Sequence, residues 1–152
     1  MAKDVVASSG TAPTDPVPAP LPGQGLLDRR FARGDITALR HLLGGAARTA
    51  GLRGQSLDDF VLAVNELVTN AVRHGGGAGR LRLWHASQGL CCEVADSGEG
   101  LAPDHPVGLE RPRTDVVGGW GMWLARRLST AMSVTTGAAG TTVRIMIQLP
   151  EG

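Results

Sequence analysis

A long amphipathic helix pattern constrains this 152-residue chain more than any other feature of its sequence. Ser56 can cap the helix, Asp59 stands three residues later in a capping-box position, and the glycines at 75–77 end it. With successive residues about 100° apart, the apolar side chains fall within one narrow arc. They are Leu57, Val61, Val64, Val68 and Ala71. Such a helix buries one face, so it requires a second layer to pack against.

Hydrophobic periodicity predicts the other elements. Asp35 is the expected N-cap of an earlier helix, and Gly51 is its expected stop. Residues 87–89 form the expected turn between two strands that follow the long helix. The predicted order is a strand over 26–32, a helix up to Ala50, the long helix, strands over 80–86 and 90–96, an irregular stretch over 101–117, a helix over 121–131, and a closing hairpin of 132–138 and 141–150.

This order predicts an α+β fold, an α/β two-layer sandwich with the helices on one face of a mixed, mainly antiparallel sheet. The length suits one domain, which is expected to span residues 26–150. Residues 1–25 hold most of the prolines and few side chains that could build a core. They are predicted to be a disordered tail that can be removed without loss of the fold.

Composition and charge argue against several classes of partner. The 15 Lys and Arg residues nearly balance the 14 Asp and Glu residues, so charge gives no reason to expect nucleic acid or an anionic membrane surface. No apolar run reaches membrane-spanning length and no signal-peptide pattern opens the chain, so a cytoplasmic location is expected. Cys91 and Cys92 are adjacent in an apolar stretch, which favours buried thiols over a disulfide or a zinc site.

Three polar residues line one ridge of the long helix, facing away from its main apolar stripe. Glu66, Asn70 and His74 follow each other in steps of four, which stacks a carboxylate, an amide and an imidazole. A solvated helix face produces the same pattern as a functional site does. Both interpretations stay open on this pattern alone.

Two glycine-rich segments follow the helix. Asp96 ends an apolar strand and opens DSGEG, which fits an ordinary Asx turn or a carboxylate that selects an exocyclic amine such as that of adenine. The second segment, GGWGMW at 118–123, precedes a helix whose N-terminal N–H groups would favour an anion. The sequence contains neither a Walker A loop nor a Rossmann fingerprint.

Together these stretches form an ordered set: ELVTNAVRH, DSGEG, GGWGMWL and then GTT at 140–142. The set resembles the N, G1, G2 and G3 boxes of the GHKL ATPase superfamily, whose Bergerat fold binds ATP under a lid. The resemblance covers roughly residues 26–150. Within the superfamily, the short form with ELVTNAVRH resembles the anti-sigma factor serine/threonine kinases.

The resemblance implies a role for each residue on the helix ridge. Asn70 takes the place of the asparagine that binds magnesium, an ion that prefers hard oxygen ligands. Glu66 takes the place of the general base of the kinase members. His74 matches a residue with a binding or structural role near the nucleotide.

The glycine-rich segments are given the remaining roles by the same resemblance. Asp96 matches the adenine-reading aspartate, and residues 101–117 match the lid. Trp120 departs from the family pattern, which often has a smaller, basic or polar residue between the G2 glycines. The other implied nucleotide contacts are Gly98 and Gly100 at the floor, Gly119, Gly121 and Met122 at the phosphates, and Thr141 or Thr142 near the adenine.

The function implied is that of an ATP- and Mg²⁺-dependent serine/threonine protein kinase. It would bind a sigma factor and phosphorylate an anti-anti-sigma antagonist with a STAS domain, and it could pair with a second copy through its first strand and helix. Two alternatives stay open, namely a non-catalytic binding module gated by nucleotide and a detached catalytic domain of the histidine kinase type.

Overall fold

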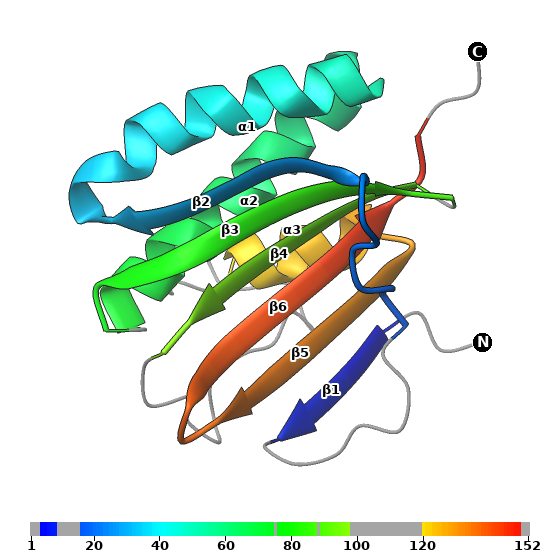
Figure 1. Ribbon diagram of the computed structural model, residues 1–152. Helices are drawn as coiled ribbons and strands as arrows, with labels where there is room; N and C mark the ends of the chain where they lie inside the picture. The colour runs from blue at the N-terminus through cyan, green and yellow to red at the C-terminus, as the bar shows by residue number, and fades with distance from the viewer. Residues whose placement is uncertain (1–3, 9–15, 75, 88, 98–119, 150–152) are drawn as a thin grey trace.

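The computed structural model describes residues 4–8, 16–74, 76–87, 89–97 and 120–149. Within these ranges, three α-helices lie on one face of a six-stranded sheet and leave the opposite face without helices (Figure 1). This arrangement confirms the predicted two-layer α+β fold. In the described part of the chain, no helix has the length and apolar character needed to cross a membrane.

The elements follow the predicted order, with one strand added at the start. The strands are β1 (Asp4–Ser8), β2 (Gly25–Ala32), β3 (Ala78–Ala86), β4 (Gly89–Asp96), β5 (Ala131–Gly137) and β6 (Gly140–Ile147). The helices are α1 (Ile36–Ala50), α2 (Gly54–His74) and α3 (Trp120–Leu128), with a 3-10 turn, η1 (Arg33–Asp35), before α1. The long helix therefore begins before the predicted cap at Ser56, and the last helix ends before the predicted limit at 131.

The sheet has the strand order β1-β5-β6-β4-β3-β2. Every neighbouring pair is antiparallel except β1 with β5, so the sheet is mixed and mainly antiparallel as predicted. The central pair β4 and β6 sets Ala95 opposite Thr142. This register brings the end of β4, where Asp96 lies, beside the beginning of β6.

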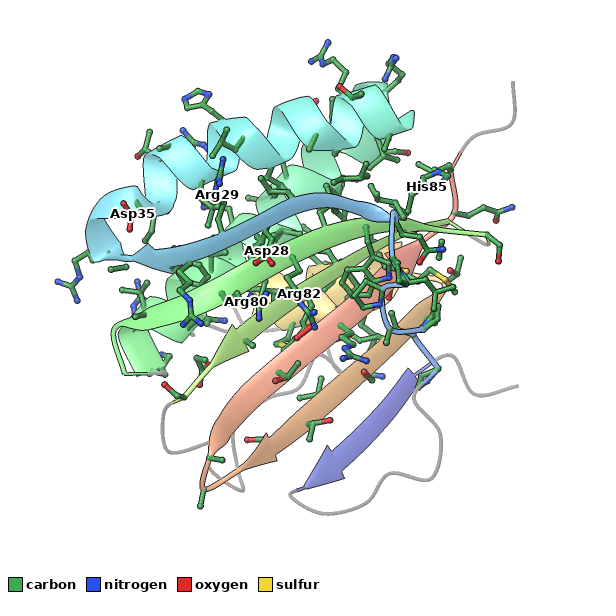
Figure 2. All side chains as sticks on the ribbon, in the orientation of Figure 1. Asp28, Arg29, Asp35, Arg80, Arg82 and His85 are labelled. Atoms are coloured by element: carbon green, nitrogen blue, oxygen red, sulfur yellow. The ribbon has the colours of Figure 1, made fainter. Side chains whose placement is uncertain are left out.

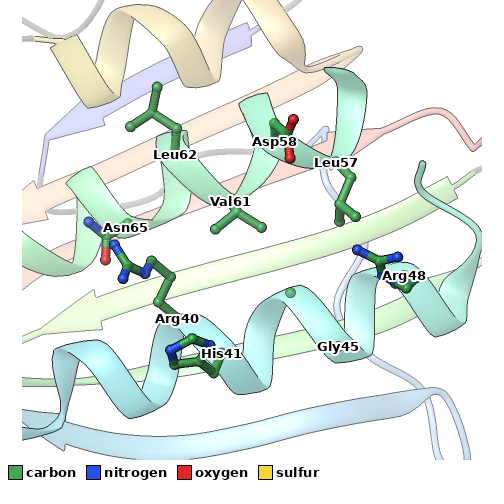
Figure 3. Close-up of a pocket in the computed structure, with 10 residues that line it drawn as sticks. Arg40, His41, Gly45, Arg48, Leu57, Asp58, Val61, Leu62 and Asn65 are labelled. Atoms are coloured by element: carbon green, nitrogen blue, oxygen red, sulfur yellow. The ribbon is translucent and has the colours of Figure 1, made fainter. Parts of the chain in front are cut away.

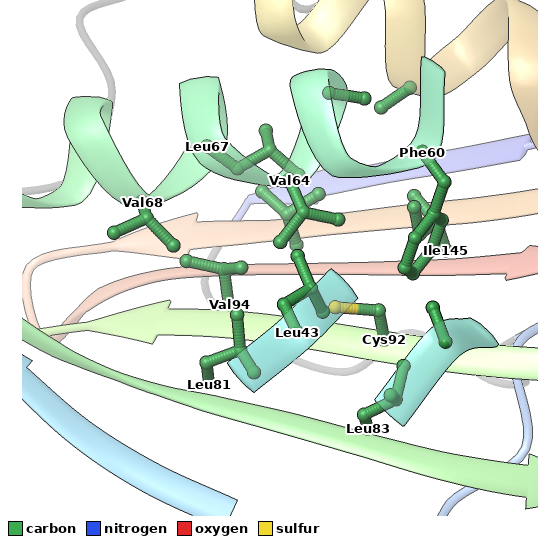
Figure 4. Close-up of a cluster of buried hydrophobic side chains, with 14 of the residues drawn as sticks. Leu43, Phe60, Val64, Leu67, Val68, Leu81, Leu83, Cys92, Val94 and Ile145 are labelled. Atoms are coloured by element: carbon green, nitrogen blue, oxygen red, sulfur yellow. The ribbon is translucent and has the colours of Figure 1, made fainter. Parts of the chain in front are cut away.

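The main core fills the space between the helices and the sheet (Figure 4). Phe60, Val64 and Val68 recur at helical spacing on α2, and Phe60 and Val64 have no exposed surface. Burying a side chain of this size stabilises the fold by roughly 1.5–3 kcal/mol. The facing side chains on the sheet are Leu81, Leu83, Cys92, Val94 and Ile145, and Leu43 joins them from α1.

The two ends of α1 are fixed in different ways. Gly51 ends the helix with φ of 122°, as predicted, and its N–H donates to the Arg48 carbonyl. Asp35 precedes the helix, but its carboxylate accepts the Ala32 N–H at 2.9 Å and caps no N–H of α1. The acid therefore fixes the turn between β2 and α1, which differs from the predicted N-cap contact.

The sheet face away from the helices carries a row of charged side chains. Figure 2 shows Asp28, Arg80 and Arg82 on this face, and Arg80 Nη2 lies 2.6 Å from Asp28 Oδ2. Arg82 pairs with Glu93, which is 7% exposed, and Arg144 Nε lies 3.6 Å from the same carboxylate. Arg82 on β3 and Arg144 on β6 therefore both face the buried carboxylate of Glu93 on β4, between them.

Cys91 and Cys92 are free, buried thiols, as predicted. Because side chains alternate along a strand, Cys92 lies in the main core and Cys91 on the opposite face. Burial raises the pKa of Cys91 to about 11 and raises that of Cys92 further. Thiolates of either residue are therefore scarce at neutral pH.

Residues 4–8 and the segment around Val17, both within the predicted disordered tail of residues 1–25, lie on the sheet. β1 pairs with β5 in parallel, and Val17 is fully buried over the sheet face away from the helices. Trp84 Nε1 donates to the Pro18 carbonyl at 3.2 Å. The difference has a physical reason, since a tryptophan on the outer face of a sheet needs both apolar cover and a hydrogen-bond acceptor.

Candidate functional site

The polar ridge of α2 lies on a half-buried flank of the helix. Glu66 and Asn70 are partly buried, and His74 is exposed in the last turn. Val61 and Asn65 line a groove beside α1, and Glu66 and Asn70 lie about 140° further round the helix. Helix α3 also packs on α2. A fully solvated face, the alternative that the sequence left open, does not describe Glu66 and Asn70.

The second part of the site is at the end of β4. Asp96 is partly buried, and its Oδ1 accepts the Thr141 N–H at 3.2 Å. Thr141 is buried, and its Oγ1 lies 2.9 Å from Thr136 Oγ1 on β5. The acid of the first glycine-rich segment and the GTT segment, which are 45 residues apart, are therefore in direct contact.

Gly140 makes this contact possible. Its φ is 130°, and a Cβ at this position would collide with the Asp96 carbonyl oxygen. Only glycine combines that backbone angle with such a close approach of β6 to the end of β4. The backbone geometry by itself therefore requires the glycine of GTT.

The remaining predicted nucleotide contacts are described only in part. Gly98, Gly100, Gly119 and the lid at 101–117 lie outside the described residues. Gly121 lies in the first turn of α3, which begins at Trp120, one residue earlier than predicted. Their proposed contacts with nucleotide stay predictions.

Met122 and Thr142 have contrasting positions. Met122 is 3% exposed and belongs to the main hydrophobic core, where it fixes the start of α3 to the rest of the fold. Thr142 is partly buried opposite Ala95 on β4. A direct nucleotide contact by Met122 stays a prediction, and the structure shows a packing role for it.

Thr136 is not among the residues that the sequence predicted for the site. This residue lies opposite Thr141 in the closing hairpin, and the two hydroxyl groups hydrogen-bond to each other across the strands. Threonine pairs of this kind stabilise a hairpin. The signal was present in the sequence as two threonines flanking the predicted turn, but the hairpin register was needed to pair them.

The donor set fits an adenine nucleotide with a magnesium ion. A carboxylate offers two oxygens that only accept hydrogen bonds, so Asp96 can accept both the Thr141 N–H and an exocyclic amine. Asn70 offers an amide oxygen, which is a hard ligand. The described residues contain no cluster of three or more His, Cys, Asp or Glu side chains that could hold a metal. A magnesium ion here would therefore take most of its ligands from phosphate and water.

Solved structures of histidine kinases share the fold. The chain is 24% identical, with a TM-score of 0.53, to the histidine kinase domain of the Erythrobacter litoralis EL346 blue-light activated histidine kinase, covering 73% of this chain and 65% of that domain. A second structure of that kinase gives 26% identity and a TM-score of 0.52, covering 76% of this chain and 40% of the other. The Acinetobacter baumannii histidine kinase AdeS gives 15% identity and a TM-score of 0.51, covering 83% and 69%.

The family assignment comes from the sequence itself. No curated protein matches the chain. A family model described as a histidine kinase-like ATPase domain matches residues 31–147, which is most of the chain and includes α2, the end of β4 and the GTT segment. This span agrees with the predicted resemblance to the GHKL superfamily. The chain belongs to the family of histidine kinase-like ATPase domains.

Proposed function

We propose that this protein is an ATP-dependent serine/threonine protein kinase of the anti-sigma factor type. In this proposal it binds a sigma factor and phosphorylates an anti-anti-sigma antagonist with a STAS domain. The observation that carries the proposal is the position of Glu66 one helical turn before Asn70 on the half-buried flank of α2. The family assignment supports ATP as the nucleotide.

Asp96 and Asn70 divide the binding of nucleotide between them in this proposal. Asp96 accepts a hydrogen bond from the exocyclic amine of adenine while the Thr141 N–H holds the carboxylate in place. Asn70 contributes an amide oxygen to a magnesium ion that neutralises phosphate charge when it is bound. Asp96→Asn should lower the affinity for ATP by about tenfold or more, because an amide presents a donor where the amine needs an acceptor.

Glu66 acts as the general base in this proposal. Its carboxylate takes the proton from a serine or threonine hydroxyl of the antagonist as that oxygen attacks the γ-phosphorus of ATP. The bond from the γ-phosphorus to the β,γ-bridging oxygen breaks, and ADP leaves. Partial burial of Glu66 favours this role, because a base must be shielded from bulk water yet reachable by a protein substrate.

The test is phosphotransfer to purified STAS-domain proteins of the host, incubated with radiolabelled Mg-ATP and this protein. Wild type should give acid-stable phosphoserine or phosphothreonine. Glu66→Ala should abolish transfer while ATP binding, measured by calorimetry, stays close to wild type. Asn70→Ala should weaken Mg-dependent ATP binding itself. Absence of transfer to every STAS protein tested would contradict the kinase assignment.

A second candidate function is phosphorylation of a histidine on a separate protein. The solved neighbours favour it, because they are histidine kinases. Acid-labile phosphoprotein would identify this activity in the same assay. If ATP binds and stays intact while a partner binds only in its presence, the chain is instead a non-catalytic module gated by nucleotide.

A further inference from the structure

A groove between α1 and α2 lies away from the proposed nucleotide site (Figure 3). Its volume is about 480 Å³. It opens on the flank of α2 that carries Val61 and Asn65, whereas Glu66 and Asn70 lie on the other flank. The groove is therefore a separate surface, and nothing in the proposed kinase chemistry uses it.

The rim of the groove is mainly basic. Arg40, His41 and Arg48 line it from α1, and Asp58 is the acidic residue of the lining. Within the described part of the chain, neither Arg40 nor Arg48 forms an ion pair through its guanidinium group. The two arginines are eight residues apart on one helix, so their backbones are separated by about 12 Å along the axis.

The floor between the arginines consists of apolar side chains from α2 and of two glycines from α1. Leu57 and Val61 contribute side chains from α2, and Leu62 beside them is 52% exposed. On α1 the floor is Gly44 and Gly45. A Cβ on Gly45 would meet nothing within 4 Å, and one on Gly44 would only touch Val61 at 3.8 Å. Two glycines inside a helix weaken it, and the packing of α1 requires neither of them.

We propose that this groove docks an acidic amphipathic helix of a partner protein. Two carboxylates seven or eight residues apart on that helix pair with Arg40 and Arg48, and apolar side chains between them cover Leu57 and Val61. The glycine pair lets the backbone of the partner approach α1 closely. The charge of the rim selects an acidic helix over a basic one. This surface adds a docking function to the proposed kinase and does not depend on it.

Fluorescein-labelled helical peptides of roughly 18 residues test the inference by anisotropy with the full chain. They share one apolar face and carry two glutamates seven residues apart, two glutamates four apart, or two lysines seven apart. The first peptide should bind about tenfold more tightly than the other two, and added salt should weaken it. Equal affinities, or no saturable binding of the first peptide, would overturn the inference.

Variants locate the binding on the protein. Arg40→Glu with Arg48→Glu should weaken binding of the first peptide by about tenfold or more. Gly45→Leu should also weaken its binding, because the leucine side chain would obstruct the floor. The matched control, Arg29→Glu with Arg33→Glu, changes two exposed arginines outside the groove and should leave binding unchanged. Circular dichroism checks the fold of each variant.

Two further results would also count against the inference. An equal loss in the control pair would show a non-specific charge effect. Groove-dependent binding of anionic lipid vesicles, without a preference among the peptides, would assign the groove to a membrane surface. Asp96→Asn should leave peptide affinity unchanged, so failure of the nucleotide assignment can be told apart from failure of the docking site.

Discussion

At the residue scale, the fold requires glycine at position 140 but not at position 45. Gly140 has φ of 130° and would place a Cβ against the Asp96 carbonyl, whereas a Cβ on Gly45 would meet only open space. Glycine is needed where the backbone angle and the close approach exclude other residues. At Gly45 the fold itself gives no such reason.

Alanine substitutions at these positions should therefore shift stability in opposite directions. Gly140→Ala should lower the free energy of unfolding by about 1–3 kcal/mol or more, because of backbone strain and the collision. Gly45→Ala should raise it by about 0.5–1 kcal/mol, because alanine favours the helix. Urea titration followed by circular dichroism measures both changes. A stabilising Gly140→Ala would show that the turn adopts another backbone conformation.

The candidate site residues could be predicted from the sequence to an uneven degree. Asp96 was singled out from its place at a strand end, but its hydrogen bond with Thr141 needed the pairing of β4 with β6. The half-burial of Glu66 and Asn70 could not be predicted, because a helical wheel shows direction and not which neighbour covers that side. Thr136 needed the register of the hairpin.

At the scale of the elements, β2 is one of the two edge strands of the sheet, and an ion pair joins it to β3. Arg80 on β3 donates to both carboxylate oxygens of Asp28 on β2, at 2.8 and 2.6 Å. The hydrogen bond from Arg80 holds the pKa of Asp28 below its usual value of 3.8. Both side chains are exposed, so solvent screens the pair and its effect is small.

The sign of the resulting pH dependence can be stated. A carboxyl group whose pKa is lower in the folded state contributes stability above its unfolded pKa and loses it as the pH falls through its folded pKa. Asp28→Asn should therefore lower stability slightly at pH 7, where the pair contributes in full, and should flatten the loss of stability below about pH 4. Urea midpoints between pH 2.5 and 7 measure it, and Arg80→Gln should give the same flattening. A steeper acid loss in Asp28→Asn would contradict the assignment.

The elements were predicted from the sequence with few errors, and each error has a physical cause. Periodicity and turn residues together predicted every helix and strand from β2 onward. α2 begins at Gly54. The prediction placed its start later, at Ser56, because Gly54 and Gln55 do not contribute to the apolar periodicity. β1 was missed because its pairing with β5 joins segments more than 120 residues apart in the sequence, which local patterns cannot show.

At the scale of the whole molecule, the sheet has two covered faces of unequal size. The main core lies between the helices and one face, and a smaller apolar cluster forms on the other. That cluster consists of Val17, Trp84, Ala86, Cys91, Ala131 and Met146. Five of the six come from the sheet, so the segment around Val17 closes a cluster that the sheet alone would leave open to water.

Removal of residues 1–20 should therefore destabilise the domain, in contrast to a removable tail. Val17 is fully buried, and loss of its cover should lower the free energy of unfolding by roughly 1.5–3 kcal/mol. The indole N–H of Trp84 would also lose the Pro18 carbonyl. Its NMR signal should move toward the position of a solvated indole, and the Tm should fall by several degrees.

Val17→Ala separates the loss of apolar cover from the loss of the Trp84 hydrogen bond, because it keeps the Pro18 carbonyl that accepts this bond. It should give part of the loss in stability with a smaller change in the indole signal. The family match begins at residue 31, so nothing in the ATPase resemblance requires this cover. If the truncated and full chains unfold at the same urea concentration and share one indole shift, the segment does not cover Trp84 in solution.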